Sequence, residues 1–249
     1  MWMAVSLITM TIVAITIGTK DSRSQERTGN SISFNPTPEN SGYKDMSRYS
    51  ITDYDESLPS DVGLGKKRKS ANGRYDGEGW VFRSPYPDGA GVGREDEKIP
   101  PPAIPVSESA LIVIGEITES HAHMSNDKLG VYTEFTIQIK EILKNDADKT
   151  LASDQLIVAD REGGYVRYPN GQKIFYESSD KALPVIWGEY VLFLTNDKLS
   201  PNYRILTLYE FKGDSIVRLD DGRNFDQFKD ASKKTFIDSI SKKVAGTSR

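Results

Sequence analysis

The apolar residues are unevenly distributed along this 249-residue chain, and their distribution limits what the chain can fold into. Segments with strand-like patterns follow one another from 110 to 219, whereas residues 19–105 are polar and rich in Pro, Gly and Ser. An ordered domain must bury enough apolar surface to offset the conformational entropy lost on folding. We therefore predict one compact β-rich domain, which a long N-terminal arm precedes.

The first residues suggest export. Residues 5–18 form an uncharged apolar run. A helix of about 17 residues spans roughly 25 Å, less than the ~30 Å hydrocarbon core of a bilayer. We predict that residues 1–24 are a signal peptide or an N-terminal membrane anchor formed by residues 3–18; a buried hydrophobic segment is the remaining alternative. Either of the first two interpretations places the rest of the chain in the periplasm, on the cell surface or outside the cell.

Residues 25–103 show no sustained period of 2 or 3.6, and they contain turn and polyproline signals such as residues 100–102. We expect this arm to be a mostly disordered spacer. One island, residues 74–82, carries three aromatic side chains, among them Trp80. It is predicted to dock on the domain as a short strand or clip. The alternatives are a recognition segment for a partner protein or glycan, and unstructured chain.

Residues 104–246 form the predicted domain. Residues 131–139 alternate between apolar and polar, which is typical of a strand with one buried and one solvated face. Asn170-Gly171 is a hairpin signal. The remaining pattern predicts strands at 110–117, 155–159, 165–168, 173–176, 189–194, 203–211 and 215–219.

The residues after Gly222 are predicted to form an amphipathic helix that Asn224 caps. Its apolar face consists of Phe225, Phe228, Phe236, Ile237, Ile240 and Val244. Many short strands with hairpins and one late helix predict an all-β fold, either a small antiparallel OB-like barrel or a sandwich, with one C-terminal amphipathic helix.

Three short elements support this fold: Ile114-Gly-Glu116, Glu141-Ile-Leu-Lys144 and Gly188-Glu-Tyr-Val-Leu-Phe193. With the strand pattern around them, they resemble a family of exported bacterial domains, and through it the OB-like barrel of netrin modules and tissue inhibitors of metalloproteinases. The resemblance implies the barrel. The eukaryotic relatives depend on cysteines that this chain lacks, so it does not carry over their inhibitory activity.

Composition excludes several classes of function. The net charge is −4, and the chain has no cysteine. A nucleic-acid partner is not expected, because such domains carry a basic excess; the basic cluster 66–69 is interpreted as a solvated charge run. Disulfides, thiolate metal sites and cysteine nucleophiles are excluded. The sequence has no nucleophile elbow, phosphate-binding loop or HExxH motif. We predict no cofactor.

The only histidines, His121 and His123, are two residues apart, and Glu119 precedes them by the same spacing. On a strand all three side chains lie on one face and offer three ligands to zinc or another divalent ion. A catalytic site would need a further carboxylate, such as Asp127 or Asp160. The alternative is a solvent-exposed strand end without a function.

Aromatic residues are the other candidates for a binding role. Trp187 with Tyr190, and the hairpin Tyr165, Tyr168 and Tyr176, are interpreted either as a surface for glycan or peptide or as cross-strand packing pairs. The charged bend 160–164 is interpreted as a solvated turn or as the rim of a ligand site.

These patterns favour an exported binding or structural module of a bacterial cell envelope, without catalytic activity. Its expected partner is a protein or an envelope polymer, and it would contact the membrane only through its N-terminal segment. The alternatives are a metal-dependent hydrolase that uses Glu119, His121 and His123, and a periplasmic protein that acts like a protease inhibitor.

Overall fold

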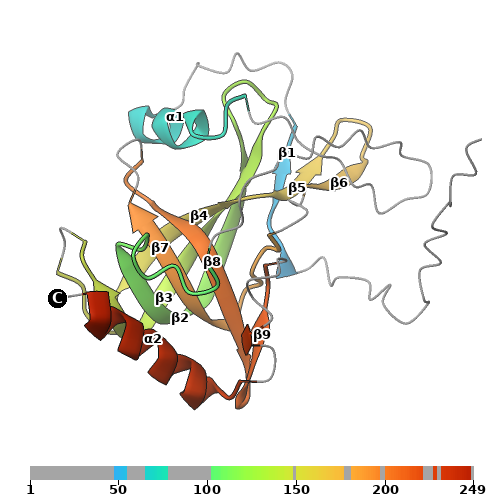
Figure 1. Cartoon of the computed structure of the whole chain (residues 1–249). Coiled ribbons are helices and arrows are strands. Elements are labelled where there is room, and N and C mark those ends of the chain that lie inside the picture. Colours follow the sequence, from blue (N-terminus) through green and yellow to red (C-terminus); the bar gives the residue numbers. More distant parts are fainter. Residues whose placement is uncertain are drawn as a thin grey trace, which may run out of the picture. The chain divides into compact units, whose positions relative to one another are not determined.

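The computed structural model describes residues 48–54, 65–77, 102–147, 150–176, 181–196, 200–220, 227–228 and 231–247. All of them belong to one compact unit, Tyr43–Arg249. Figure 1 colours the chain from its N-terminus to its C-terminus. The predicted signal peptide, Trp80 and Asn224 lie outside the described residues.

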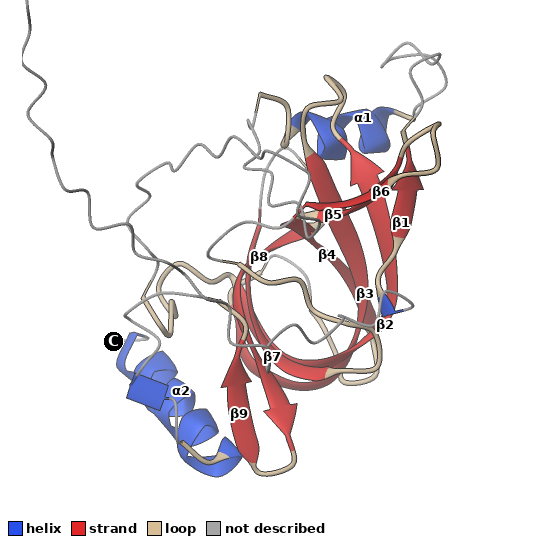
Figure 2. Cartoon of the chain, turned by 90° about the vertical axis from the view of Figure 1, so that its right-hand side faces the viewer, coloured by secondary structure: helices blue, strands red, loops and turns tan. Residues whose placement is uncertain are grey.

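Six strands form the main sheet, in the order β4-β3-β2-β7-β8-β9. They are β2 (Leu111–Met124), β3 (Val131–Asn145), β4 (Leu156–Glu162), β7 (Glu189–Asn196), β8 (Tyr203–Lys212) and β9 (Ser215–Arg218). Neighbours in this order pair antiparallel, and β4 also pairs parallel to β8, with Ala159 opposite Tyr203 and Asp160 opposite Arg204. The pairing joins the two sides of the sheet into a partly closed barrel (Figure 2). The predicted all-β fold with one C-terminal helix is confirmed.

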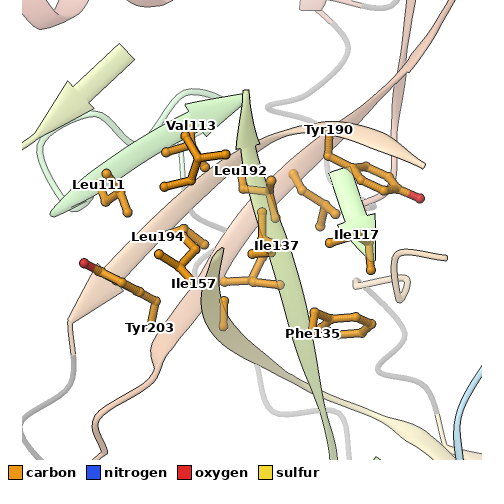
Figure 3. Close-up of a cluster of buried hydrophobic side chains, with 14 of the residues drawn as sticks. Leu111, Val113, Ile117, Phe135, Ile137, Ile157, Tyr190, Leu192, Leu194 and Tyr203 are labelled. Atoms are coloured by element: carbon orange, nitrogen blue, oxygen red, sulfur yellow. The ribbon is translucent and has the colours of Figure 1, made fainter. Parts of the chain in front are cut away.

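The barrel interior holds the main hydrophobic core. Alternate residues of β3, namely Phe135, Ile137 and Ile139, are at most 1% exposed and pack against side chains from β2, β4, β7 and β8 (Figure 3). The alternation predicted from the sequence is therefore correct, and it leaves Glu134 and Thr136 on the outer face of the same strand.

Two strands extend beyond their predicted ends. β2 continues through His121 and His123 to Met124, and β3 continues to Asn145. Each strand is the hydrogen-bonded partner of the other along almost its whole length, so residues with little strand preference are held in the ladder. Three register shifts within the pair, the last between Ile117 and Glu119, curve the strands.

The C-terminal helix α2 (Lys233–Thr247) packs on the outer face of the sheet through Phe236 and Ile240. It begins later than predicted because Ser232 supplies the N-cap: its hydroxyl accepts a hydrogen bond from the Thr235 amide at 3.2 Å. Phe228 precedes the helix, and its ring contacts Phe236.

Ser232→Ala is expected to lower the free energy of unfolding by about 1 kcal/mol, because the amide at the start of α2 loses its side-chain acceptor. Urea unfolding of the full chain measures the loss. Ser239→Ala, on the exposed side of the same helix, is the matched control and should change stability by less than about 0.5 kcal/mol. Equal losses in the two variants would contradict the cap.

A second sheet has the order β1-β5-β6. The predicted hairpin forms β5 (Gly164–Arg167) and β6 (Lys173–Tyr176), with Gly171 at a φ of 83° in its turn. The strand β1 (Ile51–Asp53), from the predicted arm, pairs parallel to β5.

Another part of the predicted arm forms α1 (Lys66–Gly73), beside the turn between β2 and β3 (Figure 1). Residues 48–54 and 65–77 are thus not spacer: they are structured, and they bind the β-domain, for example through the Ser50 hydroxyl, which accepts from the Ala122 amide, and through the ion pair of Arg74 with Asp160. Within the described ranges, no helix combines the length and apolar character that crossing a bilayer would need.

Candidate functional site

Within the described residues, the structure does not bring the three predicted metal ligands into one cluster. Glu119 and His121 lie on β2 with side chains 65% and 62% exposed. Oε2 of Glu119 is 3.8 Å from Nε2 of His121. His123 is more buried, and its Nε2 atom lies 3.4 Å from Oε2 of Glu134 on the neighbouring strand. Across the described part of the chain, no three His, Asp or Glu side chains group closely enough to hold a metal.

Asp127 and Asp160, the two carboxylates considered as a further metal ligand, instead hold parts of the fold together. Asp127 accepts hydrogen bonds from the backbone amides of Gly77 (2.6 Å) and Leu129 (2.9 Å), so it holds the turn after β2 and the residue Gly77 together. Partial burial acts to raise the pKa of Asp127, but hydrogen bonds from the Ser125 hydroxyl and from the backbone amides outweigh it and lower the pKa. Asp160 is fully buried under Arg74 and Tyr75.

The predicted aromatic pair of Trp187 and Tyr190, at the start of β7, is also separated. Tyr190 is fully buried and belongs to the barrel core (Figure 3), where its hydroxyl accepts a hydrogen bond from the Val185 amide. The prediction that Tyr190 shares a binding surface with Trp187 is therefore wrong, because the alternation of β7 turns Tyr190 inward. Trp80, the third candidate, lies outside the described residues.

Among the residues that the structure describes, Trp187 is the most exposed large apolar side chain, at 67%. Its backbone has a φ of 65°, a left-handed conformation that costs a non-glycine residue about 1–2 kcal/mol. The loop that carries it is firmly held: the Trp187 amide donates to the Ile117 carbonyl at 2.8 Å, and the Ile117 amide donates to the Gly188 carbonyl at 3.1 Å. The indole is thus presented to solvent on a rigid support.

The hairpin tyrosines pack against aromatic residues of the arm. Tyr165 contacts Tyr49 and stacks on Phe175 at 4.4 Å, and Tyr168 stacks on Tyr54 at 5.0 Å. The cross-strand interpretation is therefore the correct one for Tyr165, and the arm segment around β1 covers the hairpin.

A polar network that the sequence did not predict lies between α1 and the outer face of β3 and β4. Nη1 of Arg74 donates to both carboxylate oxygens of Asp160, at 2.6 and 2.8 Å, and the Tyr75 hydroxyl donates to the same carboxylate at 2.6 Å. All three side chains are buried: that of Arg74 is 3% exposed and that of Asp160 is 0%. The predicted docking of the island 74–82 is thus confirmed for its first two residues.

The second carboxylate of the network belongs to Glu134, which lies directly opposite Asp160 on the neighbouring strand. Nη1 of Arg68, on α1, donates to Glu134 at 2.6 Å. The Asn202 side-chain amide donates to it at 2.8 Å. Tyr132 lies two residues before Glu134 on the same strand. Its hydroxyl donates to Asn72 of α1 at 2.6 Å, and its ring stacks on that of Tyr75.

Burial and charge act differently on the two carboxylates. Burial raises the pKa of Asp160 and outweighs its contacts with Tyr75 and Arg74. Burial also acts to raise the pKa of Glu134, but His123 and Arg68 outweigh it, and the pKa is lowered. Burial raises the pKa of Tyr132 to about 12. Glu134 thus remains charged in mildly acidic solution, and it needs its cations there.

The bend 160–164 was interpreted as a solvated turn or a ligand rim, and both interpretations are wrong for its first two residues. Asp160 faces the network under α1, and Arg161 points into the barrel at 1% exposure. There the Nη2 atom of Arg161 donates to Asp220, which also accepts from the Thr207 hydroxyl. In the described structure, Nε and Nη1 of Arg161 have no hydrogen-bond partner.

Comparisons with known proteins leave the geometry as the sole guide to function. No protein-family model matches the chain. No curated protein and no solved structure matches it either.

Proposed function

We propose that this chain is an exported, non-catalytic binding module of a bacterial cell envelope, and that it contacts a protein or an envelope polymer through Trp187. The observation that carries the proposal is the combination of 67% exposure and a left-handed backbone at Trp187, on a loop fixed by backbone hydrogen bonds. Neither property stabilises the fold, since exposure forgoes the gain from burying the ring. Strained residues at exposed positions are frequent in binding sites.

The chemistry of the side chain fits this role. Tryptophan provides a large rigid contact area and an N–H donor, and it is among the residues that dominate binding energy at interfaces. Its ring stacks equally on sugar rings and on peptide side chains. Small β-barrels present ligand-binding loops of this kind at their ends. The export part of the proposal has its support in the uncharged apolar run 5–18.

The metal-dependent hydrolase has less support, because His123 contacts Glu134 rather than completing a site with Glu119 and His121. Metal analysis of the purified chain distinguishes the two functions. Stoichiometric zinc that is lost in the His121→Ala/His123→Ala variant would favour the hydrolase and contradict the non-catalytic binding module.

Trp187→Ala is expected to lower ligand retention at least tenfold and to leave the free energy of unfolding within about 1 kcal/mol of the wild type, since the ring is 67% exposed and little packing is lost. Retention is measured by capture from an envelope protein extract and by co-sedimentation with purified peptidoglycan. Leu156→Ala, at a residue that is 58% exposed on β4, is the matched control. Equal retention by wild type and Trp187→Ala would refute the proposal.

A further inference from the structure

The outer face of β3 and β4 contains an arrangement that is unfavourable on its own. Glu134 and Asp160 are cross-strand partners, so two carboxylates of like charge lie side by side. Both are removed from water, with side chains 12% and 0% exposed. Two buried carboxylates require cations and hydrogen-bond donors on the same face.

The β-domain itself supplies few of these. Asn202 donates to Glu134, His123 approaches it to 3.4 Å, and Arg204 lies opposite Asp160 in register. The direct guanidinium contacts come from residues 65–77, through Arg68 to Glu134 and Arg74 to Asp160. This segment is remote in sequence, since residues 78–101 separate it from the first described residue of the domain.

Residues 65–77 are held as a bound peptide would be held. They add no strand to either sheet. Side chains make the decisive contacts: two arginines reach the two carboxylates, and the Tyr75 ring stacks on Tyr132 with centroids 4.5 Å apart and an interplanar angle of 11°. Arginine and tyrosine are the residues that most often anchor a partner at an interface.

We propose that Glu134, Asp160, Tyr132 and Asn202 form an acidic slot that binds a polypeptide segment with two arginines and a tyrosine in the spacing Arg-x5-Arg-Tyr. In the isolated chain Arg68, Arg74 and Tyr75 occupy this slot in cis. A partner protein with such a segment binds by displacing residues 65–77. The slot goes beyond the proposed function, because it uses a different surface from Trp187 and a partner of defined chemistry.

The cis segment is suited to displacement. The helix α1 has eight residues, a length at which an isolated helix is marginal in water. The hold of the segment on the domain depends on the side-chain contacts and on the hydrogen bonds that Asn126 and Asp127 make with its backbone. Its tether to the same chain adds a high effective concentration. A competing peptide must displace this segment in the wild type, but not in a variant that lacks both arginines and the tyrosine of the segment.

The first test measures binding of a fluorescent 13-residue peptide with the sequence of residues 65–77 by anisotropy. The full-length Arg68→Ala/Arg74→Ala/Tyr75→Ala variant, with a vacant slot, should bind it at least tenfold more tightly than the wild type does. Adding Asp160→Asn to that variant should weaken binding at least tenfold, whereas adding Asp53→Asn, at an exposed carboxylate on β1, should not. Absence of binding to a folded vacant variant, or binding insensitive to Asp160, would overturn the proposal.

A second test keeps the native slot contacts and does not depend on the vacant variant folding. The chain has no cysteine, so Lys67→Cys, at an exposed position of α1, accepts a single spin label. Excess unlabelled peptide should raise the mobility of the label, and a peptide with both arginines and the tyrosine replaced by alanine should not. Unchanged mobility at millimolar peptide would overturn the proposal. Dimers that form with concentration and are abolished by Asp160→Asn would support the slot and identify a second copy as the partner.

Discussion

Asp220→Ala is expected to lower the free energy of unfolding by about 3–5 kcal/mol, the usual loss when one member of a buried ion pair is removed. Asp220 is the only carboxylate that the structure shows bonded to Arg161, and both side chains are buried inside the barrel. Arg161 cannot lose its proton at any pH at which the protein folds. The variant therefore keeps an uncompensated charge in the core. Urea unfolding at neutral pH measures the loss.

Arg161→Met, the reverse deletion, is expected to cost less and to respond to pH. Burial already raises the pKa of Asp220, and removing Arg161, which acts to lower it, raises it further. A raised folded-state pKa means that stability is fully present below the unfolded pKa of about 3.9 and is lost as pH rises through the folded value. The deficit of Arg161→Met should therefore shrink on acidification toward about pH 4, whereas that of Asp220→Ala should not.

The exposed pair of Asp53 and Arg167 is the control for both variants, since Asp53→Ala should change stability far less than Asp220→Ala does. If Asp220→Ala destabilised the fold no more than Asp53→Ala, Arg161 would have found another acceptor or water, and the buried pair would not be a main contributor to stability.

Tyr75→Ala is expected to weaken the docking of residues 65–77 by about 3 kcal/mol, because a fully buried aromatic side chain is lost with its stacking on Tyr132 and its bond to Asp160. The loss corresponds to a roughly 100-fold larger population of the undocked segment. Limited trypsin digestion detects it, because cleavage follows the population of the open form when opening is fast. Mass spectrometry should show cleavage after Lys67, Arg68 and Lys69 accelerated by a similar factor.

Tyr54→Ala provides the comparison. Tyr54 also lies in the arm, but its ring stacks on Tyr168 beside the second sheet. Its removal should leave the cleavage rate after Lys67 unchanged. If Tyr75→Ala digested at the wild-type rate, the contacts around Asp160 would not be what holds residues 65–77, and the acidic slot would lose its basis.

The strands and their turns could be predicted because their signals are local. Residues 131–139 alternate, Asn170-Gly171 favours a tight hairpin, and 173–176 matches β6 at both ends. The start of α2 was missed because two different arrangements satisfy its apolar face. Phe228 packs on Phe236 from outside the helix, and a cap at Ser232 is as good locally as one at Asn224.

The candidate sites were harder to predict, since they depend on what lies across from each residue. His121 and His123 share a spacing typical of metal ligands, but the neighbouring strand places Glu134 beside His123. Tyr190 and Trp187 differ by three residues: β7 turns Tyr190 into the core, whereas Trp187 lies in the loop before that strand and reaches solvent. Arg74 and Tyr75 belong to an aromatic island in a polar part of the chain. This pattern correctly predicts that they dock on the domain, but it does not indicate which residues they contact.

The sequence by itself determined the all-β class and the inward face of strands such as β3, because a period of two lets only one set of side chains leave water. Tertiary structure decided the rest: which strands became partners, that Glu134 and Asp160 stand opposite each other, and that a segment of the arm neutralises them. The reason is that register and docking are set by contacts between residues far apart in the chain, and these contacts have no signature in the local pattern of either segment.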